Sequence, residues 1–404
     1  MSSYNLSPDD ALKTHVQLPV LDVDFYSDES IRDPYPLYRR MRDLGPVIRL
    51  SRHDLFAVTR YADVRSLLRD FRSFSSAHGV AVDPAVNDLM ASRTSLSSDP
   101  PLHEEIRKVT SAPLLPRALE SLQANIQQTA DSLVDELCTR KYFDGMRDLA
   151  QVLPLTIVSE LVGLPSYGRD SMLRWAAATF NALGPMNQHG QNARSILTEY
   201  YDYCRSEAVP GKLRPGGWAD ALYEAARRGE FPIERCPGMI KEYIGPSLDT
   251  TIFATGHLIR LLGENPKQWD AIRANPDLIP GAINEALRIE SPIRAFTRMT
   301  STEVSVAGVP LPAGSRVLVV FASANRDERH WPEPDAYQVD RKADGHVAFG
   351  HGIHTCAGMH LARMEMTAIM RALVRRVSRI EVGQPTIAVN NVLRGYESLP
   401  VRFN

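Results

Sequence analysis

The residues with the clearest chemical signal in this chain surround a single cysteine. The stretch FGHGIHTCAG runs from Phe349 to Gly358 and contains Cys356. Its glycines let the backbone turn tightly and approach a flat or bulky group. A helical apolar pattern follows, so we expect Cys356 near a helix N-terminus, where backbone N–H groups and the helix dipole favour the thiolate. A lone cysteine is more often an inert buried residue, but six specified positions within ten residues favour a thiolate ligand.

An acid–alcohol pair, Asp249-Thr250, is the second candidate, and it follows an unusual glycine–proline step. Gly-Pro normally ends a helix, yet the apolar run IFATGHLIRLL continues directly afterwards. Either two elements meet here, or one helix carries Pro246 in its interior. An interior proline costs about 3 kcal/mol and removes the N–H that would bind the Glu242 carbonyl. An Asp-Thr pair alone is most often a helix N-cap, but near a thiolate it can relay protons.

Two further charged pairs have the spacing of one helix face. Glu285 and Arg288 stand at i and i+3, where such a pair is usually solvated and contributes roughly a few tenths of a kcal/mol. Asp99 before two prolines predicts a helix start, which places His103 and Arg107 at i and i+4. By themselves these pairs predict only exposed polar side chains.

Most of the elements that position these residues are predicted to be helices. Apolar residues recur at i, i+3, i+4 spacing in four segments, 34–44, 118–140, 278–290 and 357–377. Strand-like segments at 47–60 and 301–324 are interrupted by Gly and Pro turns. Residues 333–348 have no periodicity, and so long an irregular segment in a compact domain is usually functional. The sequence therefore predicts a mainly α protein with small β-sheets.

Composition places the chain among globular proteins. Of its 404 residues 44% are hydrophobic and 23% charged, and the net charge of -2 gives no footprint for nucleic acid or an anionic membrane. No 18-residue apolar span and no signal-peptide pattern is present, so we expect a cytoplasmic protein. The four cysteines lack CxxC spacing, which argues against disulfides or structural zinc. We expect a single domain over residues 1–404, since no repeat or linker interrupts the chain.

The cysteine stretch resembles the haem-thiolate signature of the cytochrome P450 monooxygenases, and the other motifs occur in that family's order. The resemblance implies the cytochrome P450 fold and a haem b with Cys356 as iron ligand, Phe349 beside it, and O2 as co-substrate. A thiolate ligand favours O–O cleavage over reversible oxygen binding. Electrons would come from NAD(P)H through a [2Fe–2S] ferredoxin or an equivalent reductase. Basic residues near the cysteine loop, such as Lys108 and Arg363, would then be candidates for its docking face.

The resemblance also assigns the charged pairs. It implies that haem propionates are bound by four residues, His103, Arg107, Arg298 and His354. It implies that Glu285 and Arg288 are buried and joined by Arg341, as structural support for the cysteine loop and not as catalysts.

In this family a long helix crosses the distal face of the haem with a pattern like A/G-G-x-D/E-T-T. Here Pro246 and Ser247 replace its two small residues, whereas Asp249 and Thr250 remain as the catalytic pair for proton delivery. We therefore interpret Gly245-Pro246 as a kink built into one helix. Peroxygenase relatives replace the acid–alcohol pair itself, so this chain fits a reductase-dependent enzyme better.

Several stretches are similar to the subfamily that O-demethylates para-methoxybenzoate and related methoxyarenes. By that resemblance the substrate pocket is lined by Phe180, Leu183, Gly245, Ile293 and Phe296, although each of these is equally consistent with ordinary core. The carboxylate clamp of the benzoate demethylases aligns with four residues that do not match it, Met90, Arg93, Lys241 and Glu242.

A glutamate at the clamp opposes an anionic ligand, so we favour a neutral methoxyarene such as a guaiacol or para-alkylguaiacol. A para-substituted benzoate stays open because Lys241 or Arg93 can bind a carboxylate. A terpenoid or other small apolar substrate also stays open. A non-catalytic haem protein is disfavoured because it has no need of the Asp249-Thr250 pair.

Overall fold

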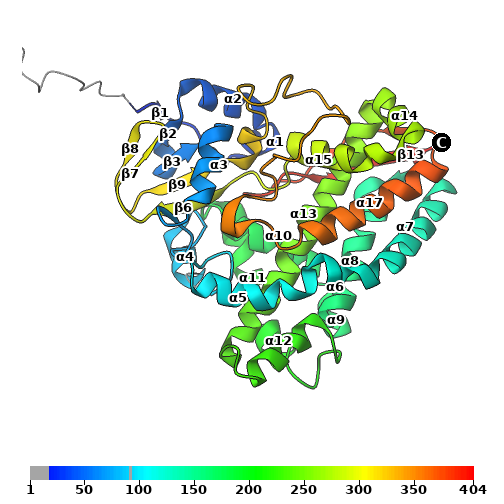
Figure 1. Cartoon of the computed structure of the whole chain (residues 1–404), viewed down its shortest axis with the longest axis horizontal. Coiled ribbons are helices and arrows are strands. Elements are labelled where there is room, and N and C mark those ends of the chain that lie inside the picture. Colours follow the sequence, from blue (N-terminus) through cyan, green and yellow to red (C-terminus); the bar gives the residue numbers. More distant parts are fainter. Residues whose placement is uncertain (1–17, 91–92) are drawn as a thin grey trace, which may run out of the picture.

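The computed structural model describes residues 18–90 and 93–404, and its elements are mainly helical, as the sequence predicted (Figure 1). The helices of the first half are α1 (Asp28–Arg32), α2 (Tyr35–Leu44), α3 (Tyr61–Arg69), α4 (Pro84–Met90), α5 (Leu102–Thr110), α6 (Pro116–Leu119), α7 (Gln123–Cys138), α8 (Val152–Val162), α9 (Ser166–Arg169), α10 (Met172–Ala182) and α11 (Gln188–Ser206). The helices of the second half are α12 (Trp218–Arg227), α13 (Cys236–Glu264), α14 (Pro266–Ala274), α15 (Ile279–Ile289), α16 (Phe321–Ala324) and α17 (Met359–Arg376).

The described strands form four small sheets. A six-stranded sheet has the order β1-β2-β3-β9-β6-β4. Its members are β1 (Val20–Leu21), β2 (Val47–Leu50), β3 (Leu55–Val58), β4 (Phe74–Ser75), β6 (Phe296–Thr300) and β9 (Arg316–Val319). The remaining strands are β5 (Phe143–Asp144), β7 (Val304–Val306), β8 (Val309–Leu311), β10 (Ile380–Val382), β11 (Thr386–Ile387), β12 (Tyr396–Ser398) and β13 (Pro400–Phe403). The predicted strand region 301–324 ends early, because backbone bonds from Ala324 to Val320 and from Asn325 to Phe321 wind its last residues into α16.

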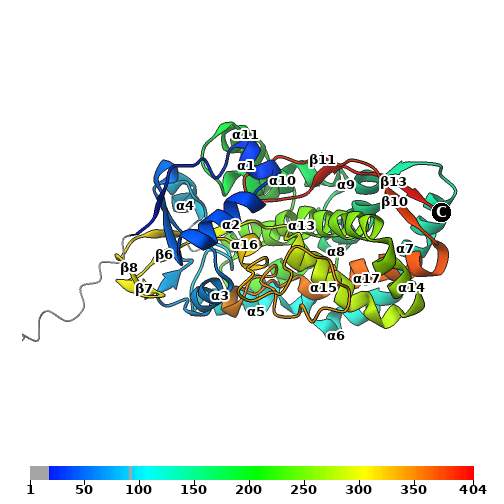
Figure 2. The ribbon, with the colours of Figure 1, turned by 90° about the horizontal axis from the view of Figure 1, so that it is seen from above.

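Helix α13 is the central element of the fold. It runs unbroken for 29 residues with Pro246 inside it, so the prediction of one helix through the glycine–proline step is confirmed. Figure 2 shows α13 passing through the middle of the molecule, with α10 and α11 on one side and α15 and α17 on the other. The largest apolar cluster packs around α13, and two smaller ones flank the six-stranded sheet. Apolar packing of this kind keeps the helix continuous, because Gly245, Pro246 and Ser247 have low helix propensity.

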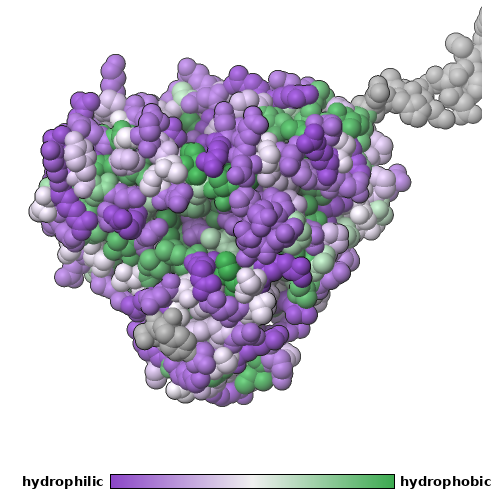
Figure 3. Space-filling model, turned by 180° about the vertical axis from the view of Figure 1, so that it is seen from behind, coloured by the Kyte–Doolittle hydropathy of each residue, from purple (hydrophilic) through white to green (hydrophobic). Residues whose placement is uncertain are grey.

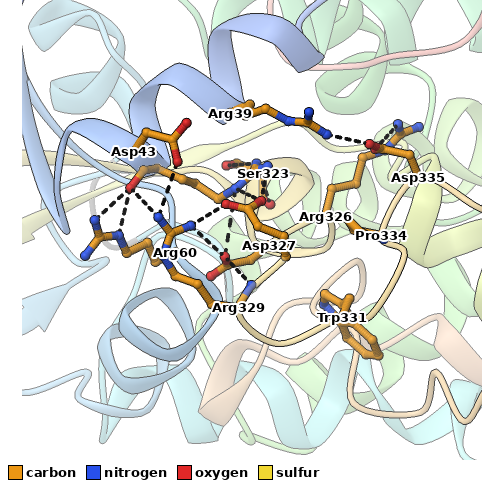
Figure 4. A network of polar contacts seen from close by, with 12 residues as sticks. Arg39, Asp43, Arg60, Ser323, Arg326, Asp327, Arg329, Trp331, Pro334 and Asp335 are labelled. Carbon is orange, nitrogen blue, oxygen red and sulfur yellow. Dashed lines mark hydrogen bonds and ion pairs between the residues drawn. The ribbon is translucent and has the colours of Figure 1, made fainter.

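The irregular segment that precedes the cysteine loop is fastened by ion pairs to the N-terminal helices (Figure 4). Asp335 accepts hydrogen bonds from Arg39 at 2.8 Å and from Arg326 at 3.0 Å. Arg329 reaches Asp43 of α2 at 3.3 Å. A segment without regular structure thereby obtains a fixed position from its side chains.

One face of the molecule can be followed in a space-filling view. On the face seen in Figure 3, hydrophobic residues form scattered patches among hydrophilic ones. Within residues 18–90 and 93–404, no helix is both long enough and apolar enough to cross a bilayer.

Candidate functional site

A cavity of about 1160 Å³ lies between α13 and the cysteine loop. Its walls include the first half of α13, the start of α17, the end of α10, one face of α11, residues 292–298 and the described residues on either side of 91–92. Cys356 and Thr250 both line it. The structure therefore brings the two motifs with the strongest chemical signal, 106 positions apart in the sequence, to one space.

The cysteine loop has the tight geometry that its glycines predicted. The Cys356 N–H donates to the Phe349 carbonyl at 2.8 Å, which closes the loop on itself. Gly350 and Gly352 have φ values of 71° and 74°, a region that residues with a Cβ rarely adopt. A Cβ on Gly352 would also come within 2.3 Å of the Leu68 carbonyl. The sulfur of Cys356 opens onto the cavity.

The acidity of Cys356 differs from the expectation. Because its sulfur faces an enclosed cavity and not bulk water, burial raises the pKa of the thiol. The N–H groups of Gly358 and Met359 and the nearby Arg107 and Arg363 oppose this rise, as expected at the start of α17. The helix terminus thus limits the rise in the pKa of Cys356 but does not lower it below its usual value. A metal cation bound to the sulfur would have to supply the rest of the stabilisation of the thiolate.

Beside Cys356, buried ring nitrogens of two histidines lack hydrogen-bond partners. Among the described residues, both ring nitrogens of His103 and Nε2 of His354 have no partner, and the two rings pack edge to face at 4.6 Å. Burial, with Arg298 next in effect, lowers the pKa of His354 to about 2, and burial lowers that of Arg298 to about 10. Arg298, Arg107 and His354 line the cavity. Two guanidinium groups and unpaired ring nitrogens, one of which can donate from each neutral imidazole, suit an anionic ligand, so these residues fit the two carboxylates of a haem.

The Glu285 carboxylate is at the centre of the predicted support network. Arg288 donates to both of its oxygens at 2.7 and 2.8 Å, and Nε of Arg341 donates at 2.9 Å. Arg288 also binds the carbonyls of Asn325 and Pro334 at 2.8 Å. The side chains of Glu285 and Arg288 have no exposed surface. The network joins α15 to the irregular segment that leads into the cysteine loop, which is the arrangement that a supporting role needs.

On α13, neighbouring members of the acid–alcohol pair face different surroundings. Thr250 lines the cavity, and its hydroxyl donates to the Pro246 carbonyl at 2.7 Å. Asp249 is 7% exposed, one turn after Gly245, whose Cα faces Thr179 of α10. Burial alone raises the pKa of Asp249 to about 7. The pair can therefore offer a fixed hydroxyl and a carboxyl that holds its proton to near neutral pH.

Four of the five predicted substrate residues, Phe180, Leu183, Ile293 and Phe296, line the cavity. Gly245 is placed differently from the expectation. It faces α10, where a Cβ on Gly245 would come within 3.4 Å of Oγ1 of Thr179, because it lies about 100° around the helix from Pro246, which does line the cavity.

A contact that the sequence did not reveal closes the cavity on the side of residues 93–96. Ser95 donates its N–H to Oε1 of Glu242 at 2.8 Å and its hydroxyl to Oε2. The stretch SRTSLSS offers no signal that singles out Ser95. Glu365 on α17 is the other omission: it lines the cavity, its Oε2 has no described partner, and burial raises its pKa to about 8. Its place nine residues after Cys356 on a helix was the available signal.

Known proteins share both sequence and fold with this chain. The Cytochrome P450 family model matches residues 183–387. Cytochrome p450 CYP199A2 of Rhodopseudomonas palustris is 35% identical over 390 residues, which cover 96% of this chain and 95% of that protein. The monooxygenase PikC of Streptomyces venezuelae is 31% identical over 401 residues, covering 95% and 94%. The crystal structure of CYP109E1 from Bacillus megaterium in complex with testosterone aligns with a TM-score of 0.84 at 25% identity, covering 94% of this chain and all of that one. Together with the cysteine loop and the fold, these likenesses show that the chain belongs to the cytochrome P450 family and is a monooxygenase.

Proposed function

We propose that this monooxygenase acts on a small methoxylated aromatic compound and releases its methyl group as formaldehyde. The observation that supports this is the cavity lining, where Phe180, Leu183, Ile293 and Phe296 share one space with Thr250. Apolar and aromatic walls of this kind suit a single ring. These four residues lie in the stretches 179–187 and 290–300, which resemble the methoxyarene demethylases.

The residues around the cavity have separate tasks in this proposal. Haem ligated by Cys356 would supply the iron centre at which dioxygen is activated. Arg298 and His354, with His103 and Arg107 next to them, would hold its carboxylates. The Thr250 hydroxyl, held by the Pro246 carbonyl, would pass protons into the cavity.

The reaction balances with the components that the family uses. One dioxygen, two electrons and two protons convert the methoxyarene into a phenol, formaldehyde and water. We propose that the electrons come from NAD(P)H through a [2Fe–2S] ferredoxin or an equivalent reductase. Lys108 is exposed on α5 and can contribute to the docking face, whereas Arg363 binds Asn284 at 2.9 Å and stacks over Phe349, which ties it to the interior.

The charge of the cavity favours a neutral substrate. Glu242 lines the wall at the position where a benzoate demethylase would need a cation or a hydroxyl, and a buried carboxylate repels another. Two alternatives have specific support. Lys241 lines the same cavity and can pair with a para-substituted benzoate. The likeness to CYP109E1, which was solved with testosterone, favours a larger apolar substrate such as a terpenoid.

A substrate screen tests the proposal. Purified holoprotein is titrated with guaiacol, para-alkylguaiacols, para-methoxybenzoate and a terpenoid, and the low-to-high-spin shift of the haem is recorded. Methoxyarenes that give a shift are then turned over with ferredoxin, reductase and NAD(P)H, and formaldehyde is measured. If methoxyarenes give a spin shift but none of them yields formaldehyde, the demethylase proposal is refuted. A carbon monoxide spectrum of the reduced protein first checks that the haem has a thiolate ligand.

A further inference from the structure

Helix α13 carries a second polar group on the face that lines the cavity. Glu242, Pro246 and Thr250 stand at i, i+4 and i+8, so all three lie on one face, and all three line the cavity. Eight residues of helix separate Glu242 from Thr250, a rise of about 12 Å. An aromatic substrate that has its reacting group beside Thr250 and lies along α13 would have its opposite end on the side of Glu242.

The Glu242 carboxylate is partly paired. Ser95 donates one hydrogen bond to each of its oxygens, and within residues 18–90 and 93–404 no cation forms an ion pair with it. Burial raises the pKa of Glu242, and the Ser95 hydrogen bonds, Arg107 and Lys241 oppose that rise. A carboxylate accepts about four hydrogen bonds. Glu242 thus retains acceptor capacity inside the cavity, where an unused acceptor is costly.

The adjacent cation on α13, Lys241, is directed elsewhere. Nζ of Lys241 lies 3.0 Å from the centre of the Tyr201 ring, on α11. Burial lowers the pKa of Lys241 to about 7, with Arg93 and Arg205 contributing in the same direction. Its charge is therefore reduced near neutral pH and its ammonium is held by an aromatic face, so it neither neutralises Glu242 nor provides a strong anion site.

We propose that Glu242 is a specificity-determining residue that accepts a hydrogen bond from a hydroxyl group at the end of the substrate opposite its methoxy group. This rests on the proposed demethylase function and narrows its substrates to para-methoxylated phenols and benzylic alcohols, which disfavours guaiacols because their hydroxyl is ortho to the methoxy group. A hydroxyl donor satisfies the buried acceptor. A methyl group in its place leaves that acceptor unpaired, and a carboxylate adds like-charge repulsion.

Three ligands of nearly the same shape test the proposal: para-methoxyphenol, para-methoxytoluene and para-methoxybenzoate. Dissociation constants come from spin-shift titration of the holoenzyme. We expect the phenol to bind about tenfold more tightly than the toluene, because only the phenol donates a hydrogen bond to the Glu242 carboxylate and a hydrogen bond to a charged group is stronger than a neutral one. We expect the benzoate to bind most weakly, because its carboxylate is repelled by that of Glu242. In Glu242→Gln the phenol should lose about tenfold in affinity. The toluene should change by less than about twofold, which also reports that the variant is folded.

Glu160→Gln is the matched control, because Glu160 is exposed on α8 and lies outside the cavity lining. It should leave all three dissociation constants unchanged. Tightest binding of the benzoate by the natural enzyme would overturn the proposal, and so would equal weakening of phenol and toluene in Glu242→Gln. The two proposals fail separately. Equal affinities with formaldehyde release from all three ligands refute only the role of Glu242, whereas the expected ranking without any formaldehyde refutes only the demethylation.

Discussion

The hydroxyl of Thr250 donates a hydrogen bond to the Pro246 carbonyl oxygen at 2.7 Å, one helical turn earlier on α13. Pro246 has no N–H to donate to the Glu242 carbonyl, so one backbone hydrogen bond of the helix is missing before Pro246. The Pro246 carbonyl, in turn, accepts the hydrogen bond from the Thr250 hydroxyl one turn later. The residue that departs most from the family pattern therefore fixes the direction of the hydroxyl proposed to move protons.

Thr250→Ala should uncouple the enzyme. Removing the hydroxyl takes away a group positioned for general acid catalysis, whose contribution is typically about 10²–10⁴-fold. We expect NAD(P)H oxidation to continue while product formation falls at least about tenfold and hydrogen peroxide accumulates. Product, peroxide and NAD(P)H are measured in the same reaction.

Thr250→Ser is the control for this change, because serine keeps a hydroxyl within reach of the Pro246 carbonyl. It should recover most of the coupling. Unchanged coupling in Thr250→Ala would remove Thr250 from the proton path.

Coupling should also depend on pH through Asp249. Burial raises the pKa of this carboxyl to about 7, so it holds a proton below that pH and loses it above. If Asp249 donates the proton, coupled product should fall as pH rises through about 7. Asp249→Asn should be poorly coupled at every pH and should show no such fall. A fall that persists in Asp249→Asn would belong to another group, with Glu365 the first alternative because its pKa is raised to about 8.

The same pKa predicts a change in stability. A carboxyl whose folded pKa lies above its unfolded value of 3.8 stabilises the fold fully only below pH 3.8, and this contribution is lost as pH rises toward about 7. Above pH 7, Asp249→Asn should therefore be more stable than the natural protein, by an amount on the order of a few kcal/mol at most. Urea unfolding on both sides of pH 7 measures this difference.

The sequence was sufficient for the local motifs and insufficient for the contacts between distant segments. The tight loop at Gly350 and Gly352 and the helix through Pro246 follow from backbone rules and from apolar periodicity. The bond between Ser95 and Glu242 does not, because it joins residues 147 positions apart through side chains that have many other possible partners. The pKa of Cys356 was also out of reach, since its direction depends on how enclosed the cavity is.

Two arginine substitutions should differ sharply in their effect on stability. Arg288→Ala leaves the fully buried Glu285 with Arg341 as its one ion-pair partner among the described residues, and breaking a buried pair costs roughly 3–5 kcal/mol. Arg39→Ala breaks a pair with Asp335 that is about half exposed, so it should cost no more than about 1 kcal/mol. Urea unfolding gives both values. Because the Glu285 network borders the segment that leads to Cys356, the first variant should also bind less haem, and similar stabilities for the two variants would contradict the supporting role.

Pro246→Ala should stabilise the fold and at the same time impair coupling. Alanine restores an N–H to the Glu242 carbonyl, which is worth up to about 3 kcal/mol in a helix interior. Pro266→Ala is the control, because Pro266 is exposed at the first position of α14, where no intrahelical bond is lost. That change should be neutral or slightly destabilising, since proline restricts the unfolded chain. If Pro246→Ala has higher stability and full coupling, the missing hydrogen bond to the Glu242 carbonyl is merely tolerated and has no role in coupling. If it has higher stability and releases more peroxide, this proline shapes the proton path.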